Sequence, residues 1–124
     1  MRVLVVDDHP TDLKLISHLL TMSGHVVFQR PSSEGVLDFV AQDRPDVVLV
    51  DLRMPGTDGV TLIRQLRGEV HTSRIPIVAV TAFPDSYSRS DLMAAGCNGF
   101  LLKPLDTRTL SERIEAAVRH GTAA

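Results

Sequence analysis

Five short apolar runs, separated by longer mixed segments, divide the chain. Each holds three or four residues, at Val3–Val6, Val26–Phe28, Val47–Val50, Ile77–Val80 and Phe100–Leu102. Uninterrupted runs rich in valine and isoleucine are typical of strands buried on both faces of a parallel sheet. The third run is the clearest, since Pro45 and Gly56 bound it, whereas Gln29 and Arg30 interrupt the second. The pattern therefore predicts five strands.

The segments between the runs carry apolar residues at the spacing of one helix face. Four stripes are clear: Leu13, Ile16, Leu19 and Leu20; Val36, Leu37, Phe39 and Val40; Leu62, Ile63 and Leu66; and Leu110, Ile114, Ala117 and Val118. Residues 85–95 are a weaker helix, which Gly96 ends. The expected boundary residues are Pro10 in a first turn and, as capping side chains, Ser32 or Ser33 and Asp106 or Thr107.

Strand and helix patterns alternate five times without a long linker, a repeat or a low-complexity segment. This alternation is typical of right-handed βαβ units around a parallel sheet. A chain of 124 residues forms one domain and buries about two-thirds of its unfolded surface. The sequence therefore predicts a single doubly wound α/β domain over residues 1–124.

Composition removes several classes of function. The net charge is −2 and the basic residues are scattered, so neither nucleic acid nor an anionic membrane is an expected partner. Cys97 is the only cysteine, which excludes an internal disulfide and indicates a small buried apolar residue. No apolar run approaches the roughly 18 residues of a membrane span, and the first is too short for a signal peptide. We expect a cytoplasmic protein, with His18, His25, His71 and His120 at its surface.

Chemically active residues follow four of the five apolar runs. They are Asp7 and Asp8, Asp51, Thr81, and Lys103. Parallel strands all end at the same edge of a sheet, where ligands of open α/β folds bind. Any one of these residues by itself reads most simply as a turn former or a solvated charge. Together, at the ends of successive strands, they indicate one shared site.

Three carboxylates in one crevice call for a cation. Two of them ~5 Å apart repel by on the order of 3 kcal/mol at an effective dielectric constant near 20. One lysine leaves the group net negative, and Mg²⁺ prefers oxygen ligands of this kind. A metal, a lysine and a hydroxyl around a carboxylate are the groups that stabilise phosphoryl transfer, and an aspartate can be the nucleophile. We therefore expect Asp51 to accept a phosphoryl group.

Four motifs together resemble the receiver domain of two-component response regulators. They are VVDD at 5–8, DLRMPGTDG at 51–59, VTA at 80–82 and KP at 103–104, and the resemblance covers essentially the whole chain. It implies a flavodoxin-like (βα)5 fold with strand order 2-1-3-4-5. It also implies that a histidine kinase or a histidine phosphotransfer protein phosphorylates Asp51.

The resemblance carries further roles onto matching positions. Asp8, Asp51 and the backbone carbonyl of Arg53 would ligate Mg²⁺, with Asp7 acting through a bound water. His9, beside the acidic pair, is interpreted as a helix-entry residue, although its position would let it modulate the pair.

The other positions concern the phosphoryl group and the response to it. Thr81 and Lys103 would contact phosphoryl oxygens, and the peptide bond before Pro104 would be cis. Thr81 would move towards the phosphoryl group, and Phe100, at the family's aromatic switch position, would fill the space it leaves. Phe83 is expected to screen the phosphoryl group from water.

The expected function is that of a single-domain response regulator that signals to a downstream protein, as a monomer or a weak homodimer. It would catalyse its own phosphoryl transfer and slow self-dephosphorylation without being a turnover enzyme. Since only a short tail follows Arg119, a stand-alone receiver is favoured over a fragment.

Three alternatives remain open. A pseudo-receiver would bind partners without phosphorylation. A flavodoxin-like cofactor binder is disfavoured because Asp7 and Asp8 would repel a phosphate. A small phosphohydrolase is disfavoured because Arg53 stands where such an enzyme carries a second carboxylate.

Overall fold

The structure is a computed structural model that describes residues 1–53, 58–81, 89–103 and 105–121. Several features of the sequence-based interpretation lie outside the described residues: the turn at Pro55 and Gly56, the screening role of Phe83, the first part (85–88) of the weaker helix, the cis peptide bond before Pro104, and the exposure of the His120 side chain. The described ranges contain every other predicted site residue.

Five parallel strands form one sheet, as the sequence predicts. The strands are β1 (Arg2–Val6), β2 (Val26–Arg30), β3 (Val47–Asp51), β4 (Ile77–Thr81) and β5 (Gly99–Leu102), in the order β2-β1-β3-β4-β5. The predicted end of the second strand is wrong, because Gln29 and Arg30 pair with Val5 and Val6 of β1. Since β2 lies at the edge of the sheet, polar side chains on it keep access to water.

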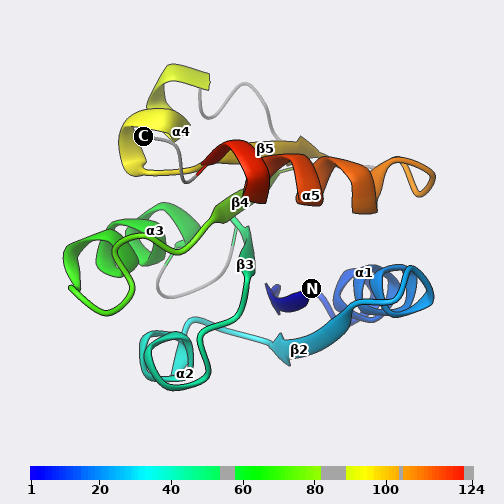
Figure 1. Ribbon diagram of the computed structural model, residues 1–124, viewed down its shortest axis with the longest axis horizontal. Coiled ribbons are helices and arrows are strands. Elements are labelled where there is room, and N and C mark those ends of the chain that lie inside the picture. The colour runs from blue at the N-terminus through cyan, green and yellow to red at the C-terminus, as the bar shows by residue number, and fades with distance from the viewer. Residues whose placement is uncertain (54–57, 82–88, 104, 122–124) are drawn as a thin grey trace.

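Helices cover both faces of this sheet (Figure 1). They are α1 (Pro10–Met22), α2 (Val36–Asp43), α3 (Gly59–Gly68), α4 (Arg89–Ala95) and α5 (Leu110–Gly121). The cores show which helix covers which face: α1 and α5 pack on one side, and α2, α3 and α4 on the other. The sheet is therefore sandwiched, and for this reason its inner strands, β1, β3 and β4, are largely apolar and buried on both faces.

One of the predicted helix caps is wrong and another is confirmed. Helix α2 begins after Gly35, which has φ +74° and offers no capping side chain, so neither Ser32 nor Ser33 is the cap. Asp106 caps the start of α5, as predicted, because its side chain accepts from the Arg108 N–H at 3.0 Å and its carbonyl accepts from the N–H of Leu110, the first residue of α5, at 3.1 Å. The expected first-turn proline of α1 is confirmed at Pro10.

Cys97 and His25 are both buried, and the sequence predicts burial only for Cys97. Cys97 is buried as expected, and burial raises the pKa of its thiol to about 11. His25 was expected at the surface but is only 6% exposed. Its Nε2 lies 2.8 Å from Ser111 Oγ on α5, and its Nδ1 lies 2.9 Å from the amino group of Met1. The packing of α5 beside the start of β2 buries this ring, which no local pattern predicts.

The register of the sheet brings the strand ends together. Val6 pairs with Val50, Asp51 with Val80, and Thr81 with Leu102. The residues that follow β1, β3, β4 and β5 therefore lie along one edge.

Among the described residues, no helix is long and apolar enough to cross a membrane.

Candidate functional site

Three carboxylates meet at the carboxyl edge of the sheet. Asp7 and Asp8 follow β1, and Asp51 is the last residue of the neighbouring strand β3. Asp7 is 1% exposed and Asp51 is 3% exposed. One ligand atom from each of these three residues and from His9 lies within 4.8 Å of all the others. The structure thus brings together the acidic residues that the sequence singled out.

Backbone hydrogen bonds hold two of these carboxylates in place. Asp7 Oδ1 accepts from the His9 N–H at 2.9 Å, and Asp51 Oδ1 accepts from the Arg53 N–H at 3.0 Å. Side chains that bond the backbone two residues on are typical of tight turns after strands. In both residues the other oxygen, Oδ2, lies 3.4 Å from Lys103 Nζ. The turns therefore orient the carboxylates as well as ending the strands.

Lys103 supplies the ammonium of the site. The residue follows β5, and its backbone N–H donates to the carbonyl of Thr81 at 2.8 Å. Its Nζ lies nearest to Asp12 Oδ2, at 2.9 Å. Its side chain is 16% exposed, so these contacts are screened less than those of a surface ion pair. One ammonium therefore neutralises part of the charge of several carboxylates.

The electrostatics follow from burial and from crowding of like charges. Burial raises the pKa of Asp7, and the charge of Asp51 raises it further. The hydrogen bond from the His9 N–H lowers this pKa but does not outweigh them. Burial lowers the pKa of Lys103, but the hydrogen bond to Asp12 and the charges of Asp51 and Asp7 outweigh it, so this pKa is raised. The charge of Asp8 is the main reason that the pKa of His9 is raised.

The donor set fits a hard divalent cation. Asp8 Oδ1 is buried and receives no hydrogen bond, although it lies 3.1 Å from His9 Nδ1. An unsatisfied carboxylate oxygen beside two buried carboxylates is costly without a cation. Carboxylate oxygens at an open cleft are the ligands that Mg²⁺ prefers. Asp8 and Asp51 are therefore suited to hold the ion, with Asp7 beside it.

Thr81 and Phe100 lie on the two strands beyond Asp51. Thr81 ends β4, is 2% exposed, and lies one position past the residue that pairs with Asp51. Phe100 on β5 is half-buried against the core of the α3 and α4 face. It lines a hollow of about 360 Å³ together with Met93 of α4 and Arg113 of α5. The structure thus places Phe100 on the β5 surface, outside the acidic cluster.

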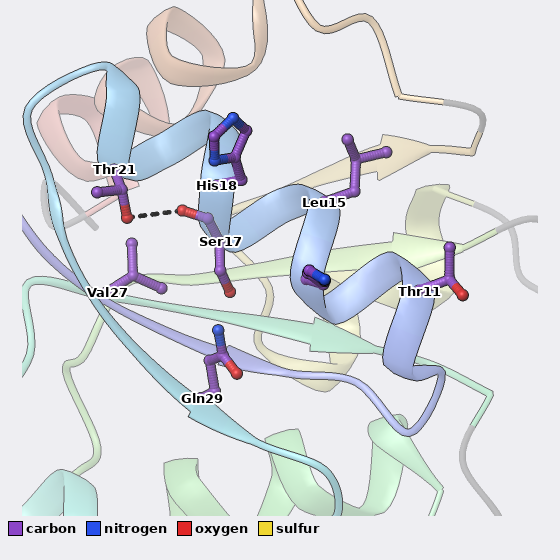
Figure 2. A pocket seen from close by; sticks show the side chains of 8 residues that line it. Thr11, Leu15, Ser17, His18, Thr21, Val27 and Gln29 are labelled. Carbon is purple, nitrogen blue, oxygen red and sulfur yellow. Dashed lines mark hydrogen bonds between the residues drawn. The ribbon is translucent and has the colours of Figure 1, made fainter.

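A larger hollow lies elsewhere, between α1 and β2. Its volume is about 820 Å³, and Figure 2 shows Leu15 and His18 of α1 around it, with Gln29 of β2. The Thr21 hydroxyl on its wall donates to the Ser17 carbonyl at 2.8 Å. None of its lining residues is acidic. This hollow is therefore separate from the acidic cluster.

Comparison with known proteins identifies the family. The family model of the response regulator receiver domain matches residues 3–115. The chain belongs to this family. PilH of Pseudomonas aeruginosa is 34% identical over 117 residues, which cover 94% of this chain and 97% of PilH. PleD of Caulobacter vibrioides is 35% identical over 118 residues, which cover 95% of this chain but only 26% of PleD.

Solved receiver domains share the fold. A putative response regulator from Chloroflexus aurantiacus matches with a TM-score of 0.88 and 30% identity, covering 95% of this chain and 97% of that one. The receiver domain of the sensor histidine kinase PA1611 from Pseudomonas aeruginosa matches with a TM-score of 0.86 and 27% identity, and the match covers 95% of this chain and 97% of that one. That structure holds a magnesium ion in its active-site cleft. As a receiver domain, this protein is a component of two-component signalling.

The structure of this receiver domain adds two residues that the sequence-based interpretation missed or undervalued. Asp12, in the first turn of α1, is the nearest partner of Lys103, yet it was given no role. Its signal was an acidic side chain one turn beyond the aspartate pair, at a helix start that favours negative charge. His9 is at the helix entry, as predicted, but its ring also lies close to the acidic residues, the role that the sequence-based interpretation ranked second.

Proposed function

We propose that this receiver domain accepts a phosphoryl group on Asp51, in a Mg²⁺-dependent reaction, from a histidine kinase or a histidine phosphotransfer protein. The main observation behind the proposal is the environment of Asp51. Asp51 is a buried carboxylate at the end of β3, and it lies 3.4 Å from Lys103 Nζ and beside the unsatisfied Asp8 oxygen. Family membership supports the same assignment.

The ion would be held by Asp8, Asp51 and the carbonyl of Arg53, with Asp7 acting through a water. When bound, it supplies positive charge that neutralises the transferring phosphoryl group. The magnesium in the cleft of the PA1611 receiver domain supports this choice of ion.

The protein groups then position and stabilise the transfer. The turn to Arg53 holds Asp51 so that Oδ2 faces the cluster, ready for in-line attack. Lys103 would exchange its contact with Asp12 for a phosphoryl oxygen, and the Thr81 hydroxyl would donate to another. Preorganised donors of this kind stabilise charge in phosphoryl transfer.

The proposed output is a conformational switch. Phosphorylation adds about two negative charges and strong acceptor oxygens at the end of β3. Movement of Thr81 towards them would let Phe100 repack and shift the surface made by α4, β5 and α5. A switch from 1:99 to 99:1 needs ~5.5 kcal/mol, and charge-assisted hydrogen bonds contribute ~1.5–3 kcal/mol each.

We also propose that residues 1–124 act as a single receiver domain on a downstream protein, as a monomer or a weak homodimer. The match extends over 97% of PilH and 93% of DivK from Brucella anthropi, which supports a single-domain role. The domain would catalyse its own phosphorylation and slow dephosphorylation, with no turnover of other substrates.

The test is phosphorylation by a small donor. Wild type, Asp51→Asn and, as a matched control, Asp38→Asn on the exposed face of α2 are incubated with acetyl phosphate and Mg²⁺. Intact mass should show one added phosphoryl group on wild type and on Asp38→Asn, and none on Asp51→Asn or without Mg²⁺. An unmodified wild type would contradict the proposal and favour the pseudo-receiver.

A further inference from the structure

The His9 ring faces the metal-binding carboxylates although its side chain is 59% exposed. Its Nδ1 lies 3.1 Å from Asp8 Oδ1, 3.4 Å from Asp7 Oδ1 and 3.5 Å from Asp51 Oδ2. These oxygens belong to three different carboxylates. A single nitrogen is therefore aimed at the point on which the acidic side chains converge.

The backbone of His9 is held in two ways. Pro10 restricts the residue before it to extended conformations, and His9 has φ −89° and ψ 110°. Its N–H also donates to Asp7 Oδ1. Although His9 is the N-cap of α1, its side chain makes no capping hydrogen bond. The imidazole is therefore placed at the cluster without any role in starting the helix.

The distances match those between neighbouring ligands of one ion. Nitrogen and oxygen ligands lie ~2.0–2.2 Å from a transition-metal ion or Mg²⁺. In octahedral or tetrahedral geometry this places adjacent ligand atoms ~3–3.5 Å apart. The three separations from Nδ1 lie in this range, so the ring needs little movement to join a coordination shell.

We propose that His9 Nδ1 is an additional ligand of this site and gives it a preference for transition-metal ions such as Mn²⁺ and Co²⁺. Imidazole suits such ions, whereas Mg²⁺ prefers an all-oxygen shell. The inference rests on the proposed metal site at Asp8 and Asp51. With His9, Asp8, Asp51 and the Arg53 carbonyl bound, a six-coordinate ion would keep two positions, one for water and one for the phosphoryl group.

The test compares metal binding by wild type, His9→Ala and His18→Ala. His18 is the matched control because it is exposed on α1, away from the carboxylates. Dissociation constants for Co²⁺ and Mg²⁺ are measured by calorimetry in the absence of a phosphodonor. His9→Ala should weaken Co²⁺ binding on the order of tenfold or more, as loss of a ligand does at least as much as loss of a supporting residue. Mg²⁺ binding should stay within about threefold, because its shell is oxygen.

A spectroscopic readout identifies the ligand directly. Mn²⁺ bound to wild type should show nitrogen modulation in pulsed electron paramagnetic resonance, retained in His18→Ala and lost in His9→Ala. Equal Co²⁺ affinity in wild type and His9→Ala would overturn the inference. Tighter binding of every ion to His9→Ala would also overturn it, showing that the ring acts as a competing cation. Either result leaves the proposed function standing if acetyl phosphate still modifies Asp51, whereas a wild type that binds no divalent ion would refute both.

Discussion

At the scale of single residues, the site is a cluster of charges that is costly in the absence of metal. Asp7 and Asp51 are buried side by side, and Lys103 is shared between them and Asp12. Burying charges costs free energy unless close partners compensate. In the proposed metal site, this arrangement would lower the stability of the metal-free fold and would attract a divalent ion strongly.

Replacing Asp7 by asparagine tests whether its charge destabilises the metal-free protein. The variant keeps an acceptor for the His9 N–H but removes a charge from beside Asp51. The pKa of Asp7 is raised in the fold above 3.8, the ordinary pKa of an aspartate. Wild type and Asp7→Asn should therefore be equally stable below about pH 3.8, where the Asp7 carboxyl is protonated in both the folded and the unfolded chain. As the pH rises through the folded pKa, wild type should lose stability relative to Asp7→Asn, by on the order of 1 kcal/mol at neutral pH.

Urea unfolding with a chelator, at several pH values, measures this difference. Saturating Mg²⁺ should reverse it, since an ion at 100 times its dissociation constant adds ~2.7 kcal/mol to the protein that binds it. A metal-free Asp7→Asn that is less stable than wild type at neutral pH would contradict the account of the cluster.

At the scale of elements, the start of α3 is pressed against the end of β3. A Cβ on Gly59 would lie 2.5 Å from the carbonyl oxygen of Asp51 and 2.6 Å from Leu52 Cα. Asp58 caps the same helix by accepting from the Thr61 N–H at 2.8 Å. The helix is therefore placed by a contact that only glycine permits.

Gly59→Ala should accordingly destabilise the protein by about 1–3 kcal/mol, because both clashing atoms belong to the backbone. It should also slow phosphorylation by acetyl phosphate, because relief of the clash displaces Asp51. The matched control is Gly68→Ala at the other end of α3, where a Cβ meets nothing within 4 Å. That change should be neutral or stabilise by up to ~1 kcal/mol. Equal effects of the two changes in thermal unfolding would refute the prediction.

Arg67 connects α3 to the elements beyond it. Its guanidinium donates to the carbonyls of Gly96, Ser73 and Ile75 and to the Asn98 side chain, at 2.6–3.1 Å. These contacts link α3 to the turn between α4 and β5 and to the segment before β4.

Arg67→Met keeps most of the apolar stem but removes this donor from the carbonyls of Gly96, Ser73 and Ile75. Asn98 Oδ1 still accepts from the Ile77 N–H at 2.7 Å. An unpaired buried acceptor costs about 1–3 kcal/mol, so the loss of stability should be on the order of 2–4 kcal/mol. Arg64→Met, on the exposed face of the same helix, should change stability by less than ~0.5 kcal/mol in urea unfolding. A loss below 1 kcal/mol for Arg67→Met would show that water replaces the guanidinium.

At the scale of the whole molecule, the sheet lies between two layers of helices (Figure 1) and separates two cores. The acidic site lies at the edge where the strands end. Strands β4 and β5 both end at this edge, and β5 is the outermost strand, where Phe100 lines a hollow with Met93 of α4 and Arg113 of α5. A charge added at Asp51 is therefore two strands away from Phe100, with Thr81 on the strand between them.

Beryllofluoride with Mg²⁺, a mimic of the phosphoryl group, should change the amide chemical shifts of α4, β5 and α5. The residues around the smaller hollow, Met93, Phe100 and Arg113, are the ones to follow. Asp51→Asn with the same additions is the control and should show no change on that surface. Changes confined to residues next to Asp51 would contradict the proposed switch.

Strand and helix patterns alternate along the chain, and each pattern is a property of its own segment. For this reason the sequence alone determined the parallel sheet and its helices. Because parallel strands end at the same edge, it also determined the common edge of Asp7, Asp8, Asp51 and Lys103. The resemblance added the strand order. Only the tertiary structure decided that Asp12 reaches Lys103, that the His9 ring approaches Asp51, and that α5 buries His25. These features depend on how segments far apart in sequence pack in three dimensions, which hydrophobic periodicity along one segment does not specify.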